Sequence, residues 1–244
     1  MKKGLYQILE NIPLTSDIFQ MTLEGDTSSI KAPGQFINIA LNGFYLRRPI
    51  SICDWTDNTI TILYKVIGKG TAYMKTQQAG ESLDILTGLG NGFDMQKSGN
   101  APLLIGGGVG IPPLYGLAKR LIEDAKKVSI ILGFNTKDDV FYADKFEKLG
   151  ATVIITTVDG SYGKKGFVTD ALEEVPESSF LYTCGPEAML HAIYKKSALD
   201  GQFSFEERMG CGFGACMSCS CQTIHGYKRI CKEGPVLERG EILW

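Results

Sequence analysis

The chain has 244 residues, of which 44% are hydrophobic and 21% charged, so it can bury one large core or two to three small ones. Its net charge of −2 argues against a nucleic acid or an anionic membrane as the partner. The first residues include two lysines but no apolar stretch and no small-residue cleavage site. We therefore expect a soluble, cytoplasmic protein without a signal peptide.

Residues 1–99 consist of short β-like runs separated by turn residues. Four runs have the alternation and the β-branched or aromatic content of strands, namely residues 18–23, 35–41, 50–54 and 59–67. Several short strands at this spacing are typical of a small antiparallel barrel. We therefore predict an antiparallel β-barrel domain over residues 1–99.

From residue 100 to residue 202, predicted strands alternate with predicted helices. Strands are expected at 103–105, 128–132, 152–156 and 180–183, and helices at 114–122, before residue 150 and from 186 to about 197. Such alternation predicts a parallel sheet with helices on both faces, here an α/β domain of residues 100–202.

The last segment, residues 203–244, is rich in cysteine. Cys211, Cys216 and Cys219 have the C-x4-C-x2-C spacing of plant-type [2Fe–2S] ligation. The small residues between them would let the loop wrap closely around a cluster. At this length the segment is too short to build a core of its own, and a metal centre is the usual remedy. We predict a small C-terminal [2Fe–2S] module.

A fourth thiolate has to approach the cluster from another direction. Cys221 is only two residues beyond Cys219 and has little freedom to reach around, whereas Cys231 follows a predicted hairpin at residues 225–226. We favour Cys231 as the fourth ligand, with Cys221 as the alternative. The other interpretations are a set of buried free thiols and a structural zinc site, but zinc prefers two paired CxxC-like knuckles and only one such pair is present.

Two segments of the barrel region indicate a flavin. Residues 46–52 read Leu-Arg-Arg-Pro-Ile-Ser-Ile, which resembles the flavin motif of the ferredoxin–NADP reductase superfamily. The resemblance implies that an arginine binds the FAD pyrophosphate and that the following strand faces the isoalloxazine; a guanidinium fork suits a phosphate. A second segment, residues 63–71, implies further flavin contacts and a helix N-terminus for the pyrophosphate. The predicted FAD residues are Arg48, Pro49, Ile50, Ser51, Leu63, Tyr64, Lys65, Gly70 and Thr71.

Two glycine-containing turns indicate a nicotinamide nucleotide. Residues 106–113 read Gly-Gly-Gly-Val-Gly-Ile-Pro-Pro, follow a predicted strand, open a helix and match the nucleotide turn of the same superfamily. Residues 183–189 resemble its C-G-P-x-x-M signature, whose cysteine lies near the reacting nicotinamide and flavin. The alternatives are a packing turn and a small buried hydrophobic residue. Because no basic cluster favours a 2′-phosphate, we prefer NAD. The predicted NAD residues are Gly107, Gly108, Gly110, Cys184 and Gly185.

Over nearly its whole length the chain resembles the electron-transfer subunits of NAD-dependent, two-subunit dihydroorotate dehydrogenases. Besides the motifs above, the resemblance rests on residues 206–216, Glu-Glu-Arg-Met-Gly-Cys-Gly-Phe-Gly-Ala-Cys. It implies FAD, a [2Fe–2S] cluster and NAD as cofactors, and a catalytic partner subunit that carries FMN and oxidises dihydroorotate in pyrimidine biosynthesis. It also implies a heterotetramer with two copies of each subunit, and no catalytic residue for dihydroorotate on this chain.

Two other functions are compatible with the same residues. One is a related FAD/[2Fe–2S] reductase subunit of a sulfide dehydrogenase or of a bifurcating ferredoxin–NADP oxidoreductase. The other is a zinc-stabilised, non-enzymatic binding module, which would be colourless because it would hold neither flavin nor iron.

Overall fold

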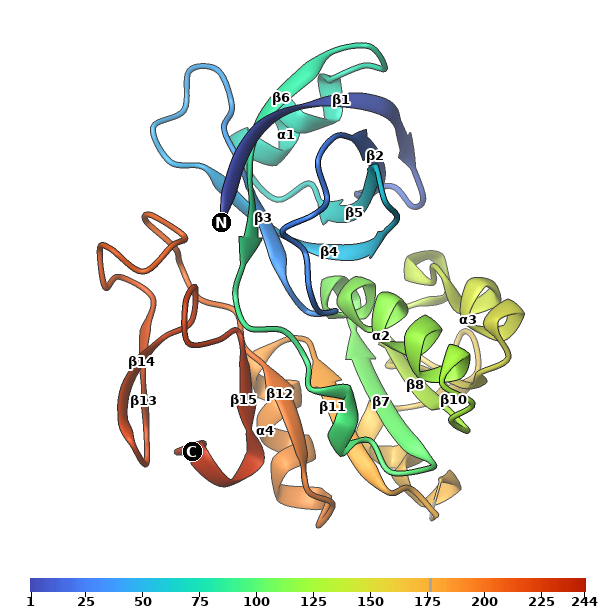
Figure 1. Cartoon of the computed structure of the whole chain (residues 1–244). Coiled ribbons are helices and arrows are strands. Elements are labelled where there is room, and N and C mark those ends of the chain that lie inside the picture. Colours follow the sequence, from blue (N-terminus) through green and yellow to red (C-terminus); the bar gives the residue numbers. More distant parts are fainter. Residues whose placement is uncertain (176) are drawn as a thin grey trace.

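The computed structural model describes residues 1–175 and 177–244. A closed barrel, a sheet flanked by helices and a cysteine-containing segment follow one another along the chain (Figure 1). Among the described residues, no helix has both the length and the apolar character needed to cross a membrane.

The N-terminal part is a closed antiparallel barrel, which confirms the predicted fold of this region. In barrel order its strands are β1 (Lys2–Pro13), β2 (Ile18–Glu24), β5 (Thr59–Lys65), β4 (Arg48–Trp55), β3 (Phe36–Ile39) and β6 (Ser82–Leu89). Helix α1 (Lys69–Thr76) connects β5 to β6. Isoleucines on alternate positions, such as Ile37 and Ile39, fill the barrel interior.

The second part is a sheet that is parallel except at one edge, in agreement with the predicted α/β arrangement. In sheet order its strands are β10 (Lys164–Lys165), β9 (Thr152–Thr157), β8 (Ser129–Phe134), β7 (Pro102–Gly107), β11 (Phe180–Cys184), β12 (Gly201–Ser204) and β15 (Val236–Glu238). Its helices are α2 (Ile111–Glu123), α3 (Ala143–Leu149) and α4 (Glu187–Lys196). Short 3-10 turns lie at Met95–Lys97, Gly108–Gly110, Lys137–Asp139, Val168–Glu174 and Arg239–Glu241.

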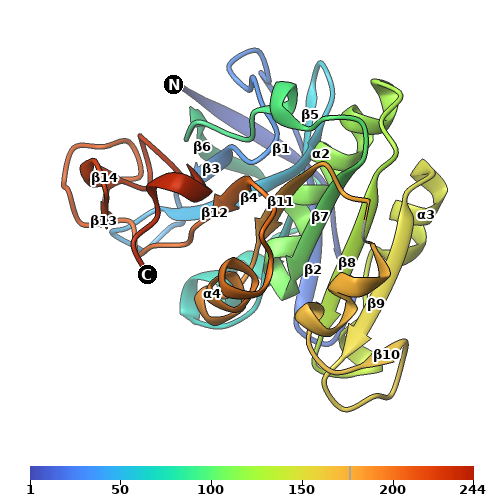
Figure 2. The ribbon, with the colours of Figure 1, turned by 90° about the horizontal axis from the view of Figure 1, so that it is seen from below.

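Helices cover both faces of this sheet (Figure 2). Leu104 and Ile130 pack in one apolar cluster with the buried face of α2. The neighbouring positions Leu103 and Ile131 pack in a second cluster with Leu190 of α4. Successive residues of one strand point to opposite faces, so each strand contributes to both cores.

The cysteine-containing segment is joined to the sheet. Strands β13 (Ser220–Thr223) and β14 (Gly226–Arg229) form the predicted hairpin, and β15 then pairs antiparallel with β12. The domain boundary predicted after residue 202 therefore falls inside β12.

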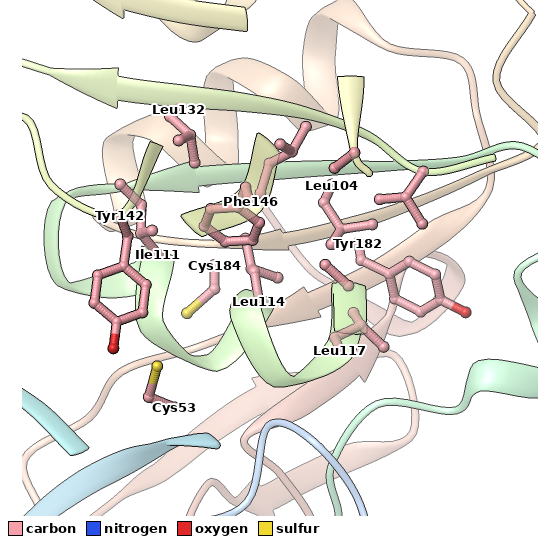
Figure 3. Close-up of a cluster of buried hydrophobic side chains, with 14 of the residues drawn as sticks. Cys53, Leu104, Ile111, Leu114, Leu117, Leu132, Tyr142, Phe146, Tyr182 and Cys184 are labelled. Carbon is pink, nitrogen blue, oxygen red and sulfur yellow. The ribbon is translucent and has the colours of Figure 1, made fainter. Parts of the chain in front are cut away.

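The barrel is packed on the sheet through β4 and α2. Gly116 lies against the backbone of Cys53, where an added Cβ would be 2.6 Å from the Cys53 carbonyl oxygen. Asp54 accepts from Lys119 at 2.7 Å, and the guanidinium of Arg120 lies 3.4 Å from the centre of the Trp55 ring. Figure 3 shows Cys53 of the barrel beside the core residues of α2 and β11. This contact sets the flavin-motif strand β4 against the helix that follows the glycine turn.

Candidate functional site

The loop that begins at Cys211 turns its backbone N–H groups toward a sulfur atom. The Sγ of Cys211 accepts from the N–H groups of Phe213 at 3.5 Å, Ala215 at 3.2 Å and Cys216 at 3.5 Å. Gly212 and Gly214 have φ angles of +79° and +92°, a region that favours glycine. The loop therefore has the form of an anion-binding nest built around a thiolate.

The predicted ligands meet as two pairs. Cys211 donates its N–H to Cys216 Sγ at 3.3 Å, and the two thiols contact each other. Cys231 donates its N–H to Cys219 Sγ at 3.5 Å, and these thiols also contact each other. All seven cysteines are free.

This pairing bears on the kind of centre. A zinc site gathers four ligands around one ion, whereas a [2Fe–2S] cluster takes two thiolates on each of two irons. The two cysteine pairs fit the requirement of the cluster.

Cys221 is not a member of either pair. It is on β13, opposite Lys228 of β14, and it lines a cavity of about 280 Å³ together with Phe205 and Trp244. Cys231 is 1% exposed and contacts Cys219. This placement supports Cys231 as the fourth ligand.

In protein stripped of iron, Cys211 is expected to react with iodoacetamide faster at pH 7 than Cys221, although both are partly exposed. Burial raises the pKa of Cys211, but the N–H groups of Phe213, Cys216 and Ala215 outweigh it and lower the pKa to about 6. The thiolate is the nucleophile, so reactivity should be lost as the pH falls through about 6. Burial raises the pKa of Cys221, which stays a thiol at pH 7. Peptide mass spectrometry after timed alkylation measures the rates for both cysteines as a function of pH. If the two rates rise at the same pH, the prediction is contradicted.

Three side chains hold the cluster loop against the rest of the molecule. Arg229 donates to the Gly214 carbonyl at 2.6 Å and is itself paired with Glu233. Asn91 bonds the Cys231–Val236 segment through the carbonyls of Glu233 and Val236. Asn38 of β3 donates to the Cys211 carbonyl at 3.0 Å. None of these three residues was singled out from the sequence; the partners of Asn38 and Asn91 are more than 140 positions away in the chain.

The two adjacent arginines of the flavin motif have different surroundings. Arg47 is bonded to two other barrel strands. It donates to the Asn38 carbonyl of β3 at 3.1 Å and pairs with Asp84 of β6 at 2.8 Å. Arg48 lies over Phe44 and against Gly70, where an added Cβ would be 2.2 Å from Arg48 Nε. The structure thus brings Arg48 to the first turn of α1, the place expected for a phosphate.

The other predicted flavin residues fall into two groups. Thr71 lies at the start of α1, where its Oγ1 accepts from the N–H groups of Ile67 at 3.0 Å and Gly68 at 3.2 Å. Pro49 and Ser51 alternate with Ile50, which packs toward the barrel core, so they lie on the outer face of β4.

The three predicted flavin residues of β5 have side chains that contact other parts of the protein. Tyr64 is buried and donates to Asn11 Oδ1 at 2.8 Å, Leu63 packs in the core shared with α2, and Lys65 pairs with Asp17 at 3.0 Å. The structure does not bring these three side chains to Arg48.

The two predicted nucleotide turns touch each other at the carboxyl ends of β7 and β11. An added Cβ on Gly110 would lie 2.3 Å from the Cys184 carbonyl oxygen. Gly107 and Gly185 both lie against Met189 of α4, with added Cβ atoms at 2.6 and 2.5 Å from its side chain. Ligands of open α/β sheets bind at this edge, so the position is suited to a dinucleotide.

A carboxylate that the sequence did not single out lies beside Cys184. Burial of Cys184 and the charge of Glu206 raise the pKa of this thiol to about 12, so it stays neutral. Glu206 follows β12, and although its side chain reaches solvent, the protein around the carboxyl group raises its pKa. The available signal was its position at the start of the 206–216 motif, two residues after β12 ends at Ser204.

Two protein families match parts of the chain. Residues 104–195 match the oxidoreductase NAD-binding domain, and residues 206–243 match the iron–sulfur cluster binding domain of dihydroorotate dehydrogenase B. The second match includes all four predicted cluster ligands.

Curated relatives are similar over the full length. The electron transfer subunit of dihydroorotate dehydrogenase B (NAD(+)) from Bacillus mycoides strain KBAB4 is 43% identical, over 100% of this chain and 99% of the relative. The subunit of the same name from Bacillus cereus strain B4264 is 42% identical with the same coverage.

Solved structures share the fold. An NADH-dependent reduced ferredoxin-NADP oxidoreductase, studied for flavin-based electron bifurcation, matches with a TM-score of 0.89 and 29% identity, over 99% of this chain and 90% of that one. A ferredoxin NADP+ reductase from Neisseria gonorrhoeae with bound FAD and NADP matches with a TM-score of 0.70 and 17% identity, over 80% and 90% of the two chains. At 17% identity, the second match shows a shared fold and no more.

Proposed function

This chain belongs to the family of electron transfer subunits of dihydroorotate dehydrogenase B (NAD(+)), and we propose that it carries electrons from the FMN of a catalytic subunit to NAD in pyrimidine biosynthesis. The proposed route runs through a [2Fe–2S] cluster and FAD, and dihydroorotate is oxidised on the partner. FAD belongs between the other two cofactors because it exchanges a hydride with a nicotinamide and single electrons with a cluster.

The observation that carries this proposal is the adjacency of the three candidate sites. The cluster loop is bonded to β3, the strand paired with the flavin-motif strand β4. The same β4 is packed on α2, whose first turn follows the glycines that touch Cys184. This adjacency of residues far apart in the chain supports the proposed order of cluster, FAD and NAD.

For FAD, the donor chemistry fits at Arg48 and α1. We assign the pyrophosphate to Arg48, Gly70 and Thr71, because a guanidinium and the free N–H groups of a helix start both favour an anion. Gly70 leaves room for the Arg48 guanidinium, which a side chain at this position would displace. We assign the isoalloxazine to the Pro49–Ser51 strand, with the backbone of 63–65 as a further contact.

For the cluster and NAD, the residues act in simple ways. Cys211, Cys216, Cys219 and Cys231 would hold the irons, and the N–H groups directed at Cys211 would reduce the charge on its sulfur. The glycine turn lets the backbone approach a dinucleotide, and Cys184 offers a neutral thiol at the nicotinamide. The glycines of this turn place no side chain between the backbone and the dinucleotide.

For the partner, we propose an FMN-containing catalytic subunit that docks over the cluster loop, in a heterotetramer with two copies of each chain. Phe213 and Met217 lie between the cysteines and are 44% and 54% exposed. Exposed apolar side chains grouped in this way are typical of a protein interface.

A related reductase subunit is the second candidate, because the oxidoreductase of the bifurcating type covers 99% of this chain. Its identity of 29% is below the 43% of the dihydroorotate dehydrogenase relative. We therefore rank the related reductase subunit second. The two candidate functions differ in the partner protein and in the substrate that reduces this partner.

The test is to co-produce the chain with an FMN-binding dihydroorotate dehydrogenase subunit under anaerobic conditions. We expect about one FAD, two irons and two sulfides per chain, and NAD-dependent formation of orotate by the complex. Zinc without flavin would overturn the proposal. A fully loaded protein that neither binds this subunit nor supports orotate formation would favour the second candidate. Native mass spectrometry decides the stoichiometry.

A further inference from the structure

Asn38 occupies an unusual position for a buried polar residue. It lies on β3 and is 2% exposed. Its neighbours Ile37 and Ile39 point into the barrel, so Asn38 points outward, toward the side where the cluster loop lies. Its cross-strand partner is Pro49, the first residue of the proposed isoalloxazine strand after Arg48.

One end of the Asn38 amide is tied to the cluster loop. Its Nδ2 donates to the carbonyl of Cys211 at 3.0 Å, across 173 residues of sequence. A Cβ on Gly212 would lie 2.3 Å from this Nδ2, so the loop approaches Asn38 as closely as a glycine allows. The orientation of the amide follows from this contact, because the flipped form would set two acceptor oxygens against each other.

The other end of the amide has no partner in the protein. Within the described part of the chain, Asn38 Oδ1 is buried and accepts no hydrogen bond. Buried acceptors are nearly always satisfied, because leaving one without a donor costs free energy. A donor from outside the chain would complete it, and the flavin site beside Pro49 is where such a donor would come from.

We propose that Asn38 is a positioning residue for electron transfer, joining the flavin site to the cluster loop through the two ends of one amide. Its Nδ2 holds the backbone of Cys211, and its Oδ1 accepts a hydrogen bond from an N–H group of the bound flavin. This inference rests on the proposed function. It adds a residue that sets the relative position of flavin and cluster without binding iron.

Two variants separate the two ends of the amide. Asn38→Asp keeps an acceptor but sets a carboxylate oxygen against the Cys211 carbonyl, so it should release the loop and retain FAD. Asn38→Leu has a similar volume and lacks both groups, so it should release the loop and also weaken FAD binding by about two- to tenfold, as for one lost hydrogen bond. In both, transfer of electrons from photoreduced flavin to the cluster should slow by about tenfold or more, the usual effect of losing an outer contact of a metal site.

The matched control is Asn11→Leu. Asn11 of β1 donates to the carbonyls of Met74 on α1 and of Gln77 directly after it, both at 2.9 Å, and accepts from Tyr64 of β5. These bonds hold α1 to the barrel, and none of them reaches the cluster loop. This variant should lower the melting temperature without changing the flavin-to-cluster rate or the EPR spectrum of the reduced cluster. These readouts distinguish positioning from a loss of barrel stability.

The experiment uses the complex with its catalytic subunit, with FAD titration, EPR and transient absorption as readouts. Slower transfer in both Asn38 variants, with FAD affinity reduced in Asn38→Leu alone, supports the proposal. Unchanged transfer in both variants overturns it, as does an equal slowing in Asn11→Leu. If Asn38→Asp loses FAD as severely as Asn38→Leu, the assignment of Oδ1 to the flavin is wrong. A wild-type complex without FAD or cluster would refute the proposed function itself.

Discussion

Replacing Cys231 with serine is expected to remove most of the cluster from the purified protein. Cys231 is buried against Cys219, and a serine hydroxyl at this position does not supply the thiolate that an iron–sulfur cluster needs. Iron and sulfide should fall by about tenfold or more, and the cysteine-containing segment should become easier to unfold, because a short segment depends on its metal centre. Iron and sulfide assays, visible absorption and thermal unfolding measure these effects.

The matched control for this prediction is Cys221→Ser. Cys221 is on β13, lines the cavity with Trp244 and is not a member of either cysteine pair. Its replacement should leave the iron content and the visible spectrum unchanged. A Cys231→Ser protein with a full cluster, together with a Cys221→Ser protein that has lost it, would exchange the roles of the two cysteines.

Replacing Gly110 with alanine is expected to impair the reaction with NAD(H) while FAD and the cluster are retained. The φ angle of Gly110 is −79°, which alanine adopts readily, so the cost comes from contact and not from backbone strain. The new Cβ would lie 2.3 Å from the Cys184 carbonyl oxygen and 2.4 Å from the Gly185 nitrogen. Both are backbone atoms, so one of the two turns has to move. A displacement of about 1 Å can cost about 100-fold in rate.

The measurements for Gly110→Ala are NADH oxidation with ferricyanide and thermal unfolding. The free energy of unfolding should fall by about 1–3 kcal/mol, the usual cost of overpacking. The control is Gly240→Ala, since an added Cβ at Gly240 has no atom within 4 Å, and this variant should be neutral to within about 0.5 kcal/mol. Wild-type kinetics in Gly110→Ala would contradict the proposed role of this contact in the nicotinamide site.

Two of the strands that the sequence did not predict, β1 and β15, have weak local patterns. Strand β1 is twelve residues long, but its fully buried side chains are only Tyr6 and Ile8, while Leu5 and Leu9 are exposed. Strand β15 has three residues and joins the sheet by pairing with β12, which is more than thirty positions earlier. Both depend on partners that are distant in the chain, and a local pattern contains no information about such partners.

Local patterns by themselves determined the barrel, the alternating α/β order, the glycine turn and the cysteine spacing of this protein. Each of these is a property of neighbouring residues, since side-chain alternation, backbone freedom and ligand spacing act over a few positions. The family resemblance then implied the cofactors from the same short motifs.

Only the tertiary structure decided which residues of these motifs meet. It separated Arg48, which lies at the start of α1, from Arg47, which pairs with Asp84 on the outer face of β6. It sorted the cysteines into two pairs, and it placed Asn38 between the flavin strand and the cluster loop. The physical reason is clearest for Asn38 and Cys211, which are 173 positions apart and meet only where the barrel and the cysteine loop pack together.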